Sequence, residues 1–142
     1  IAREPLWRHL INYRCGTGHS VSFVGNVHEG PHALNGRNTV VFQPGMIVTD
    51  EPGVYEGGQV GIRIENELMC VHKADNQYGT FLGFEPIMFV PIATSPVVPG
   101  VLTRDELDWL NAYHREVFTK LAPHLTEEER DWLAKKCAAI GA

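Results

Sequence analysis

"CGTGHSVSFVGNVHEGPH", residues 15–32, contains five glycine or proline residues and three histidines, at positions 19, 28 and 32. Glycine costs backbone entropy in a strand or a helix, so packing alone does not favour this density. The composition indicates a loop whose backbone approaches another part of the chain closely and which exposes its imidazole groups. A short strand is expected within it, near residues 21–24.

The residues that follow this loop have the periodicity of β-strands. "TVVFQPGMIVTDEPGVY" (39–55) holds two apolar runs separated by a Gln-Pro-Gly turn. "GQVGIRIENELMCVHKA" (58–74) alternates, with aliphatic residues at even positions and charged residues at 63, 65 and 67. "TFLGFEPIMFVPI" (80–92) predicts a further strand, with its proline at an edge or a bulge. Residues 6–11 show a short helical spacing.

The last forty residues predict two helices. Thr103 followed by Glu106 is a capping box, and Thr126 followed by Glu129 is a second one. Apolar residues at helical spacing follow each box, and a short turn at 123–125 separates them.

The length and the composition limit the class of protein. The chain has 142 residues, of which 44% are hydrophobic and 20% charged, as in an ordinary globular domain. A net charge of −5 without a basic block excludes a nucleic-acid surface, and the apolar stretches are too short to span a membrane. Three scattered cysteines indicate reduced thiols in a cytoplasmic protein. The first residue is Ile1, so we expect a processed product or a piece of a longer protein.

Three residues are candidate metal ligands: His19, Glu51 and Glu65. Each residue also has an ordinary structural explanation. His19 could be a hydrogen-bonded loop histidine, Glu51 could mark the end of a strand, and Glu65 could lie on the solvated face of a strand. Together, one imidazole and two carboxylates would form a hard, oxygen-rich set suited to manganese, iron(II), cobalt or zinc. A single zinc or iron ion is the smaller alternative that this inventory leaves open.

Several motifs, in order, resemble a known family. "GTGHSVSFVGNVHEGPH", "MIVTDEPGVY" and "GIRIENELMC" are similar to the three C-terminal signatures of aminopeptidase P (Xaa-Pro aminopeptidase), a pita-bread metallopeptidase. "FLGFEPIMFVPI" and "LTRDELDWLNAYHREVFTKLAPHLTEEERDWL" resemble the C-terminal extension of its long form. Prolidase and creatinase share the fold, but Val-His-Glu-Gly-Pro is typical of aminopeptidase P. Methionine aminopeptidases lack the Gly-Ile-Arg-Ile-Glu-Asn signature.

The resemblance implies an α+β architecture, the C-terminal half of a pita-bread fold with a helical extension. Residues 1–92 would form the C-terminal half of the catalytic domain, an antiparallel sheet with helices, and residues 93–142 would form a two-helix extension. The N-terminal half of the catalytic domain would then be a missing partner. An isolated half exposes the surface that its partner covers, so we expect it to bind a complementary fragment or to form a homodimer.

The resemblance also implies a two-metal site. The family binds two divalent ions, usually manganese, through two aspartates, one histidine and two glutamates. His19 and Glu51 match metal ligands, and Glu65 matches the carboxylate that bridges both ions. Zinc, cobalt or iron are the other candidate metals. The two aspartates lie upstream in the family, and no matching strand precedes His19, so the site is expected to be incomplete.

The remaining site residues surround these ligands in the family. Glu51 matches the general base that acts with a metal-activated water. His28 matches the histidine that binds the substrate and transfers protons, and Tyr55 an active-site tyrosine beside the substrate. Arg63 matches an arginine that orients the carboxylates. His32 has no role in the implied site and is expected to belong to a surface loop.

The implied reaction is hydrolysis of the peptide bond between an N-terminal residue and proline. The isolated chain is expected to be inactive or very weak, because three protein ligands are few for two ions. The chain departs from the family pattern at Cys15, Ser20 and Ser22, which would narrow the groove and remove a polar contact to the substrate. A metal-free interaction or dimerisation module of the same fold is the alternative function.

Overall fold

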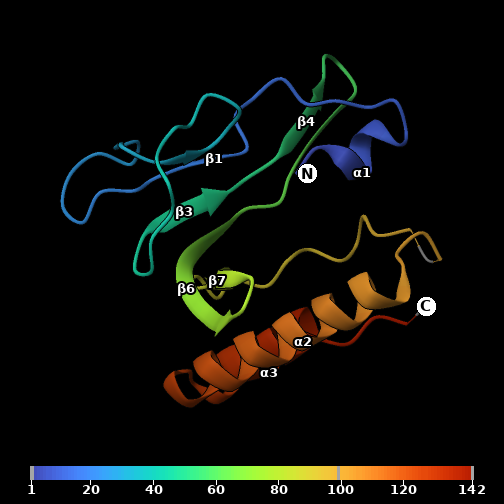
Figure 1. Ribbon diagram of the computed structural model, residues 1–142. Coiled ribbons are helices and arrows are strands. Elements are labelled where there is room, and N and C mark those ends of the chain that lie inside the picture. Colours follow the sequence, from blue (N-terminus) through green and yellow to red (C-terminus); the bar gives the residue numbers. More distant parts are fainter. Residues whose placement is uncertain (1, 99, 142) are drawn as a thin grey trace. The chain divides into compact units, whose positions relative to one another are not determined.

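The computed structural model describes residues 2–98 and 100–141. By compactness the chain forms two units, Ile1–Met88 and Phe89–Ala142. The domain boundary expected from the sequence falls at residue 92. Figure 1 follows the chain through both units, which we describe one at a time.

Over residues 2–88 the first unit contains a short helix and seven antiparallel strands in three sheets. The sheets have the orders β1-β2, β3-β6-β7 and β4-β5. The elements are α1 (Glu4–Trp7), β1 (Gly18–His19), β2 (Ala33–Leu34), β3 (Ile47–Asp50), β4 (Gly53–Glu56), β5 (Val60–Arg63), β6 (Asn66–Asn76) and β7 (Gly79–Pro86).

One register runs through two of these sheets. Asp50 pairs with Asn66 in β3–β6, and Gly53 pairs with Arg63 in β4–β5, so both ladders continue the same pairing. The interruption coincides with Pro52, whose nitrogen has no hydrogen to donate to a ladder. The two sheets are therefore successive parts of one long hairpin.

Strand β1 lies antiparallel to β3 on the edge opposite β6. The Glu51 N–H donates to the Thr17 carbonyl over 2.6 Å, and Ser20 forms an isolated bridge with Val48. This pairing sets His19 beside β3, as Figure 1 shows for the two strands. The glycine-rich loop thus begins at the edge of the sheet.

Two details of the predicted strands are wrong. Residues 21–24 form no strand, and the side chains of Phe23 and Val24 are exposed, with no neighbouring strand to cover them. The first apolar run of 39–55 forms none either, since the strand begins only at Ile47. β7 ends at Pro86, in agreement with the edge position predicted for this proline.

The second unit contains the two predicted helices. These are α2 (Arg104–Leu121) and α3 (Glu127–Lys136), joined by a 3-10 turn, η1 (Ala122–His124), and both capping boxes are present. Tyr113, Val117 and Leu133 form the core of the unit. Within the described part of the chain, no helix has the length and apolar character needed to cross a membrane.

Candidate metal centre

Three charged residues of the long hairpin, Glu51, Arg63 and Glu65, share one face. Residues that pair directly in an antiparallel ladder project on the same side, and so do residues two apart in a strand. By the continuous register, Glu51 lies opposite Glu65, and Arg63 is two residues before Glu65. Asp50 lies on the other face, where partial burial raises the pKa of its carboxyl. The register places these charged residues on the face that the sequence predicts for them, although Ile62 and Ile64 on the opposite face are also exposed.

His19 and Glu51 are in direct contact. The His19 Nε2 atom lies 2.8 Å from Oε1 of Glu51, and both side chains are largely buried, at 21% and 13% exposure. The Nδ1 atom of His19 lies 3.0 Å from the Ser20 carbonyl oxygen. Since a carbonyl can only accept, Nδ1 carries a hydrogen. Nε2 then faces a carboxylate, so this pair requires either a proton or a metal cation between its lone pairs.

Thr49 orients both members of this pair. Thr49 is 2% exposed. Its Oγ1 atom accepts a hydrogen bond from the backbone N–H of His19 over 3.0 Å and donates one to Oε1 of Glu51 over 2.9 Å. Thr49 is a site residue that was not predicted from the sequence. The available signal was its position two residues before Glu51, on the same face of the same strand.

Arg63 connects Glu51 to Tyr55. Nη1 of Arg63 donates to the other carboxylate oxygen of Glu51, and Nε donates to the Tyr55 hydroxyl over 2.7 Å. The bond to Tyr55 and the charge of Glu51 raise the pKa of the guanidinium further. The tyrosine ring lies over Gly53 and Gly61, where an added Cβ would come within 2.8 and 2.9 Å of it. Two glycines therefore leave room for this ring.

His28 reaches the same place from the glycine-rich loop. Its ring centroid lies 4.0 Å from that of His19, with 42° between the planes. The side chain is otherwise exposed. The loop therefore presents one imidazole beside another.

Gly18 shows why the loop is rich in glycine at this point. A Cβ on Gly18 would lie 1.7 Å from the carbonyl oxygen of Thr49, so only glycine lets β1 approach β3 this closely. This close approach is the one that the sequence predicts for the segment.

The three predicted ligands do not meet fully. Glu65 lies opposite Glu51 along the backbone, but its side chain is exposed. Over residues 2–98 and 100–141, no three histidine, cysteine, aspartate or glutamate side chains are grouped closely enough to hold a metal ion. The structure thus joins five of the six predicted site residues by contacts and relates the sixth through the strand register.

The positions that depart from the family motif line the same edge. Cys15 Sγ lies 3.4 Å from the Gly53 carbonyl oxygen, at the start of β4. The hydroxyl groups of Ser20 and Ser22 are buried and have no hydrogen-bond partner among the described residues.

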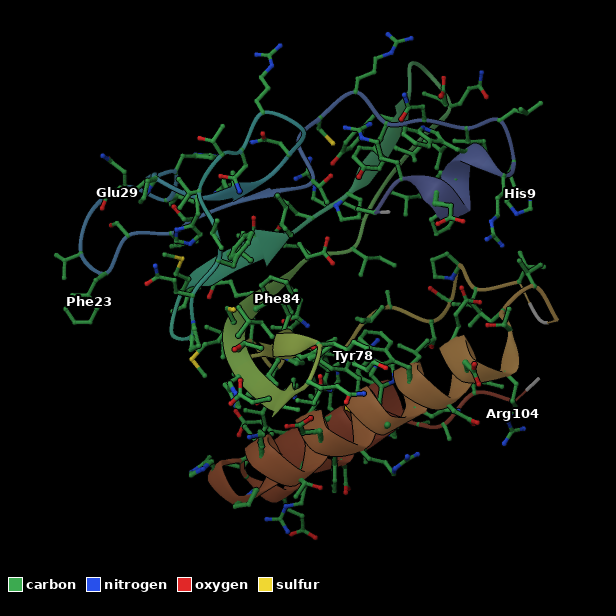
Figure 2. All side chains as sticks on the ribbon, in the orientation of Figure 1. His9, Phe23, Glu29, Tyr78, Phe84 and Arg104 are labelled. Carbon is green, nitrogen blue, oxygen red and sulfur yellow. The ribbon has the colours of Figure 1, made fainter. Side chains whose placement is uncertain are left out.

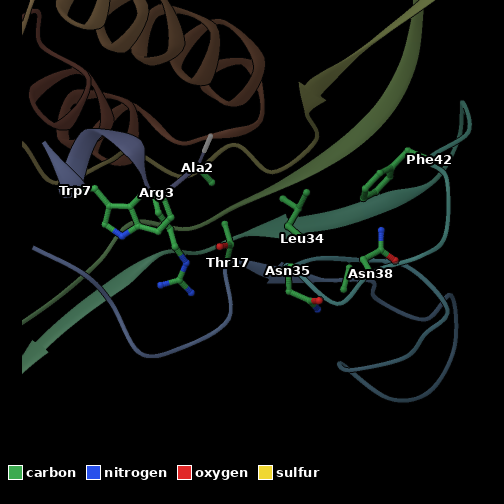
Figure 3. A pocket seen from close by; sticks show the side chains of 10 residues that line it. Ala2, Arg3, Trp7, Thr17, Leu34, Asn35, Asn38 and Phe42 are labelled. Atoms are coloured by element: carbon green, nitrogen blue, oxygen red, sulfur yellow. The ribbon is translucent and has the colours of Figure 1, made fainter.

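A separate cavity of about 550 Å³ lies near α1 and β2, lined by Trp7 among others (Figure 3). None of the predicted site residues lines that cavity.

Two family models match the sequence. The model of metallopeptidase family M24 matches residues 1–72, and that of the C-terminal region of peptidase M24 matches residues 80–140. The first model alone covers half of the 142 residues. The chain belongs to metallopeptidase family M24.

Curated relatives narrow the resemblance. Aminopeptidase P1 of Lotus japonicus is 42% identical over 147 residues, which covers 99% of this chain and 22% of the relative. Aminopeptidase P2 of Arabidopsis thaliana is 47% identical over 139 residues, which covers 93% and 19%. The resemblance to aminopeptidase P is thus confirmed, and the chain spans about a fifth of the length of these relatives.

A solved structure has the same fold. The X-prolyl aminopeptidase from Caenorhabditis elegans, described as a cytosolic enzyme with a di-nuclear active site, matches with a TM-score of 0.86 and 36% identity. The match covers 97% of this chain and 23% of that one. The predicted α+β, pita-bread fold class is confirmed.

Proposed function

We propose that this chain supplies one side of the active site of an Xaa-Pro aminopeptidase. The substrate would be a peptide with proline in second position. The cofactor would be two divalent cations, with manganese as the first candidate and zinc, cobalt or iron as the others. The contact between His19 and Glu51, on the strand face that also carries Glu65, is the observation that supports this proposal most strongly.

The donor atoms suit such a cation. A metal-binding histidine commonly donates its second ring N–H to a carbonyl, as His19 does to Ser20, and this leaves Nε2 free to coordinate. Carboxylates at Glu51 and Glu65 add the hard oxygen ligands that manganese prefers. Bound divalent cations would lower the pKa of water, so that hydroxide forms near neutral pH.

Each protein residue then has a defined task. Glu51 would accept the proton of water, with its two oxygens oriented by Thr49 and Arg63. His28, beside His19, would hydrogen-bond to the scissile carbonyl or transfer a proton to the leaving proline nitrogen. The Tyr55 hydroxyl, fixed by Arg63, would border the bound peptide.

We further propose that the chain needs a partner for turnover. Three protein ligands are few for two ions, so the 142-residue chain alone is expected to have very low activity. Exposed apolar side chains at Val60, Ile62 and Ile64 favour pairing with the other half of the catalytic domain or with a second copy.

The three cysteines are free, as expected for a reducing compartment, and we propose a cytoplasmic location.

A metal-free interaction module is the second candidate. One observation favours it: the described residues contain no group of three ligands close enough to hold an ion. Manganese titration of this chain, beside a version extended upstream to the length of the relatives, separates the two functions when cleavage of an Xaa-Pro peptide is followed.

We expect turnover by the extended protein and at most a trace from the 142-residue chain. No turnover by either protein would contradict the peptidase. Equal turnover by both would show that further ligands are dispensable.

A further inference from the structure

We infer that His32 is a positioning residue, which holds the loop that carries His28 against β3 and so keeps the His28 ring beside His19. The use of His28 in catalysis rests on the proposed function. The attachment of the loop to β3 by His32 does not depend on that function. His32 was expected to be a surface-loop residue without a role; the structure instead makes it half-buried.

The loop of residues 20–32 is closed at its base by two backbone hydrogen bonds. The Ser20 N–H donates to the His32 carbonyl and the Glu29 N–H donates to the Ser20 carbonyl, both over 3.1 Å. Residues 23–31 of the loop are exposed, and Figure 2 shows Phe23 and Glu29 among them. The position of His28 therefore depends on how the returning limb, residues 28–32, is attached.

The His32 side chain makes that attachment. Its Nε2 atom lies 2.7 Å from the Ile47 carbonyl oxygen and must donate, because the carbonyl only accepts. The Cys70 N–H donates to the Met46 carbonyl, so the next carbonyl, that of Ile47, points to the edge opposite β6. Strand β1 ends at His19. The His32 imidazole thus supplies a donor to the strand edge beyond the end of β1.

The ring is also held from the side. His32 and Phe42 meet edge-to-face, with centroids 5.5 Å apart and 71° between the planes. Phe42 in turn meets Phe84 of β7 with centroids 5.2 Å apart. The imidazole is therefore fixed both by a hydrogen bond to β3 and by an aromatic contact that leads to β7.

Two substitutions separate the donor from the ring. His32→Phe keeps an aromatic ring against Phe42 and removes the donor to Ile47. His32→Gln removes the ring but places an amide N–H at a length close to that of Nε2. His9→Phe is the matched control, because His9 is an exposed histidine of the same unit.

The test uses NMR on the metal-free 142-residue chain. It measures amide exchange at Glu29 and the nuclear Overhauser effect between the rings of His19 and His28. With His32→Phe we expect about tenfold faster exchange at Glu29, the effect of one lost hydrogen bond, and loss of the ring contact. His32→Gln restores both, and His9→Phe changes neither.

The inference is overturned if His32→Phe keeps the wild-type exchange and the ring contact, or if a folded His32→Gln loses both. If His32→Phe does not fold, a folded His32→Gln with wild-type values supports the inference. Failure of both variants to fold overturns a role confined to the loop.

A second readout uses the extended protein with an Xaa-Pro peptide. His32→Phe is expected to lower kcat with little change in KM, and His32→Gln to recover most of it. Absence of wild-type turnover would contradict the proposed function while leaving the NMR result to decide on His32.

Discussion

The two units of the chain bury different kinds of side chain. In Phe89–Ala142 the buried side chains described are apolar or aromatic, with one histidine, whereas in Ile1–Met88 four of the six carry a hydroxyl. The buried residues are Tyr13, Thr17, Ser20, Val48, Thr49 and Cys70 in the first unit, and Leu107, Leu110, Tyr113, His114, Val117 and Leu133 in the second. The first unit therefore uses burial to orient polar groups, and the second uses it to stabilise a helix pair.

The largest expected effect concerns the first unit, Ile1–Met88. Glu51→Gln in the extended protein keeps the shape of the side chain but removes its charge, so peptide turnover should fall about 1000-fold. Steady-state kinetics with an Xaa-Pro peptide measures this loss. Glu67→Gln, on the same strand face opposite Thr49, is the matched control and should keep activity. Equal losses for both variants would mean that Glu51 has no special role.

The helix pair should respond to a lost apolar contact instead. Leu133 is 2% exposed, and Leu133→Ala should lower the free energy of unfolding by about 3 kcal/mol. The adjacent Trp132 is 56% exposed, and Trp132→Ala should cost less than about 1 kcal/mol. Urea unfolding followed by circular dichroism compares the two. A smaller loss at Leu133 than at Trp132 would contradict the position of the core.

Thr49 should matter for binding more than for folding. Thr49→Val keeps the side-chain shape and removes the hydroxyl between His19 and Glu51, so manganese affinity should fall about 10- to 100-fold. Calorimetric titration of the extended protein measures it. Thr39→Val, at an exposed position of the same unit, is the control. Unchanged affinity in Thr49→Val would remove its orienting role.

The buried histidine of the helix pair predicts a pH dependence. His114 is fully buried, its Nε2 accepts from the Ile92 N–H over 3.1 Å, and burial lowers its pKa below the ordinary 6.5. The unfolded state then binds the proton more readily. The contribution of His114 to the free energy of unfolding is thus fully present above pH 6.5. It is lost as the pH falls through the lower pKa that His114 has in the folded state.

Unfolding measured by urea at a series of pH values tests this, with a slope of at most about 1.4 kcal/mol per pH unit below 6.5. His114→Gln should flatten the profile, and the exposed His124→Gln should not. An unchanged slope in His114→Gln would assign the dependence to another group.

The smallest expected effect is at the helix caps. Thr126 accepts from the Glu129 N–H, and Thr126→Ala should cost about 1 kcal/mol of unfolding free energy. Thr126→Ser keeps the hydroxyl and should cost much less. Thermal unfolding of the two variants checks the difference, and equal losses would show that the cap does not stabilise α3.

The helix pair could be predicted from the sequence because its determinants are local. A capping box places a threonine three residues before a glutamate, and both boxes begin the helices where expected. Helical spacing then identified most of the buried face. Trp132 stands beside Leu133 among the large apolar residues after the second box, yet it is 56% exposed, and Leu133 is the buried residue of this short helix.

The structure brings five of the six predicted site residues into contact, but the sequence did not indicate the residues that position them. Alternation in residues 58–74 identified the polar face, since strand periodicity is also local. Thr49 and His32 act through hydrogen bonds to residues 30 and 15 positions away, and no pattern within one segment indicates such a pairing. The strand expected at 21–24 was wrong for the same reason, because a strand requires a neighbour that the local sequence does not specify.

The most direct test of the central claim is anomalous diffraction at the manganese edge from crystals of the 142-residue chain soaked in manganese. We expect a peak within bonding distance of His19 Nε2 and the carboxylates of Glu51 and Glu65, and no such peak in Glu51→Gln. Well-ordered crystals in which these three side chains face one another without a peak, or diverge from any common point, would contradict it.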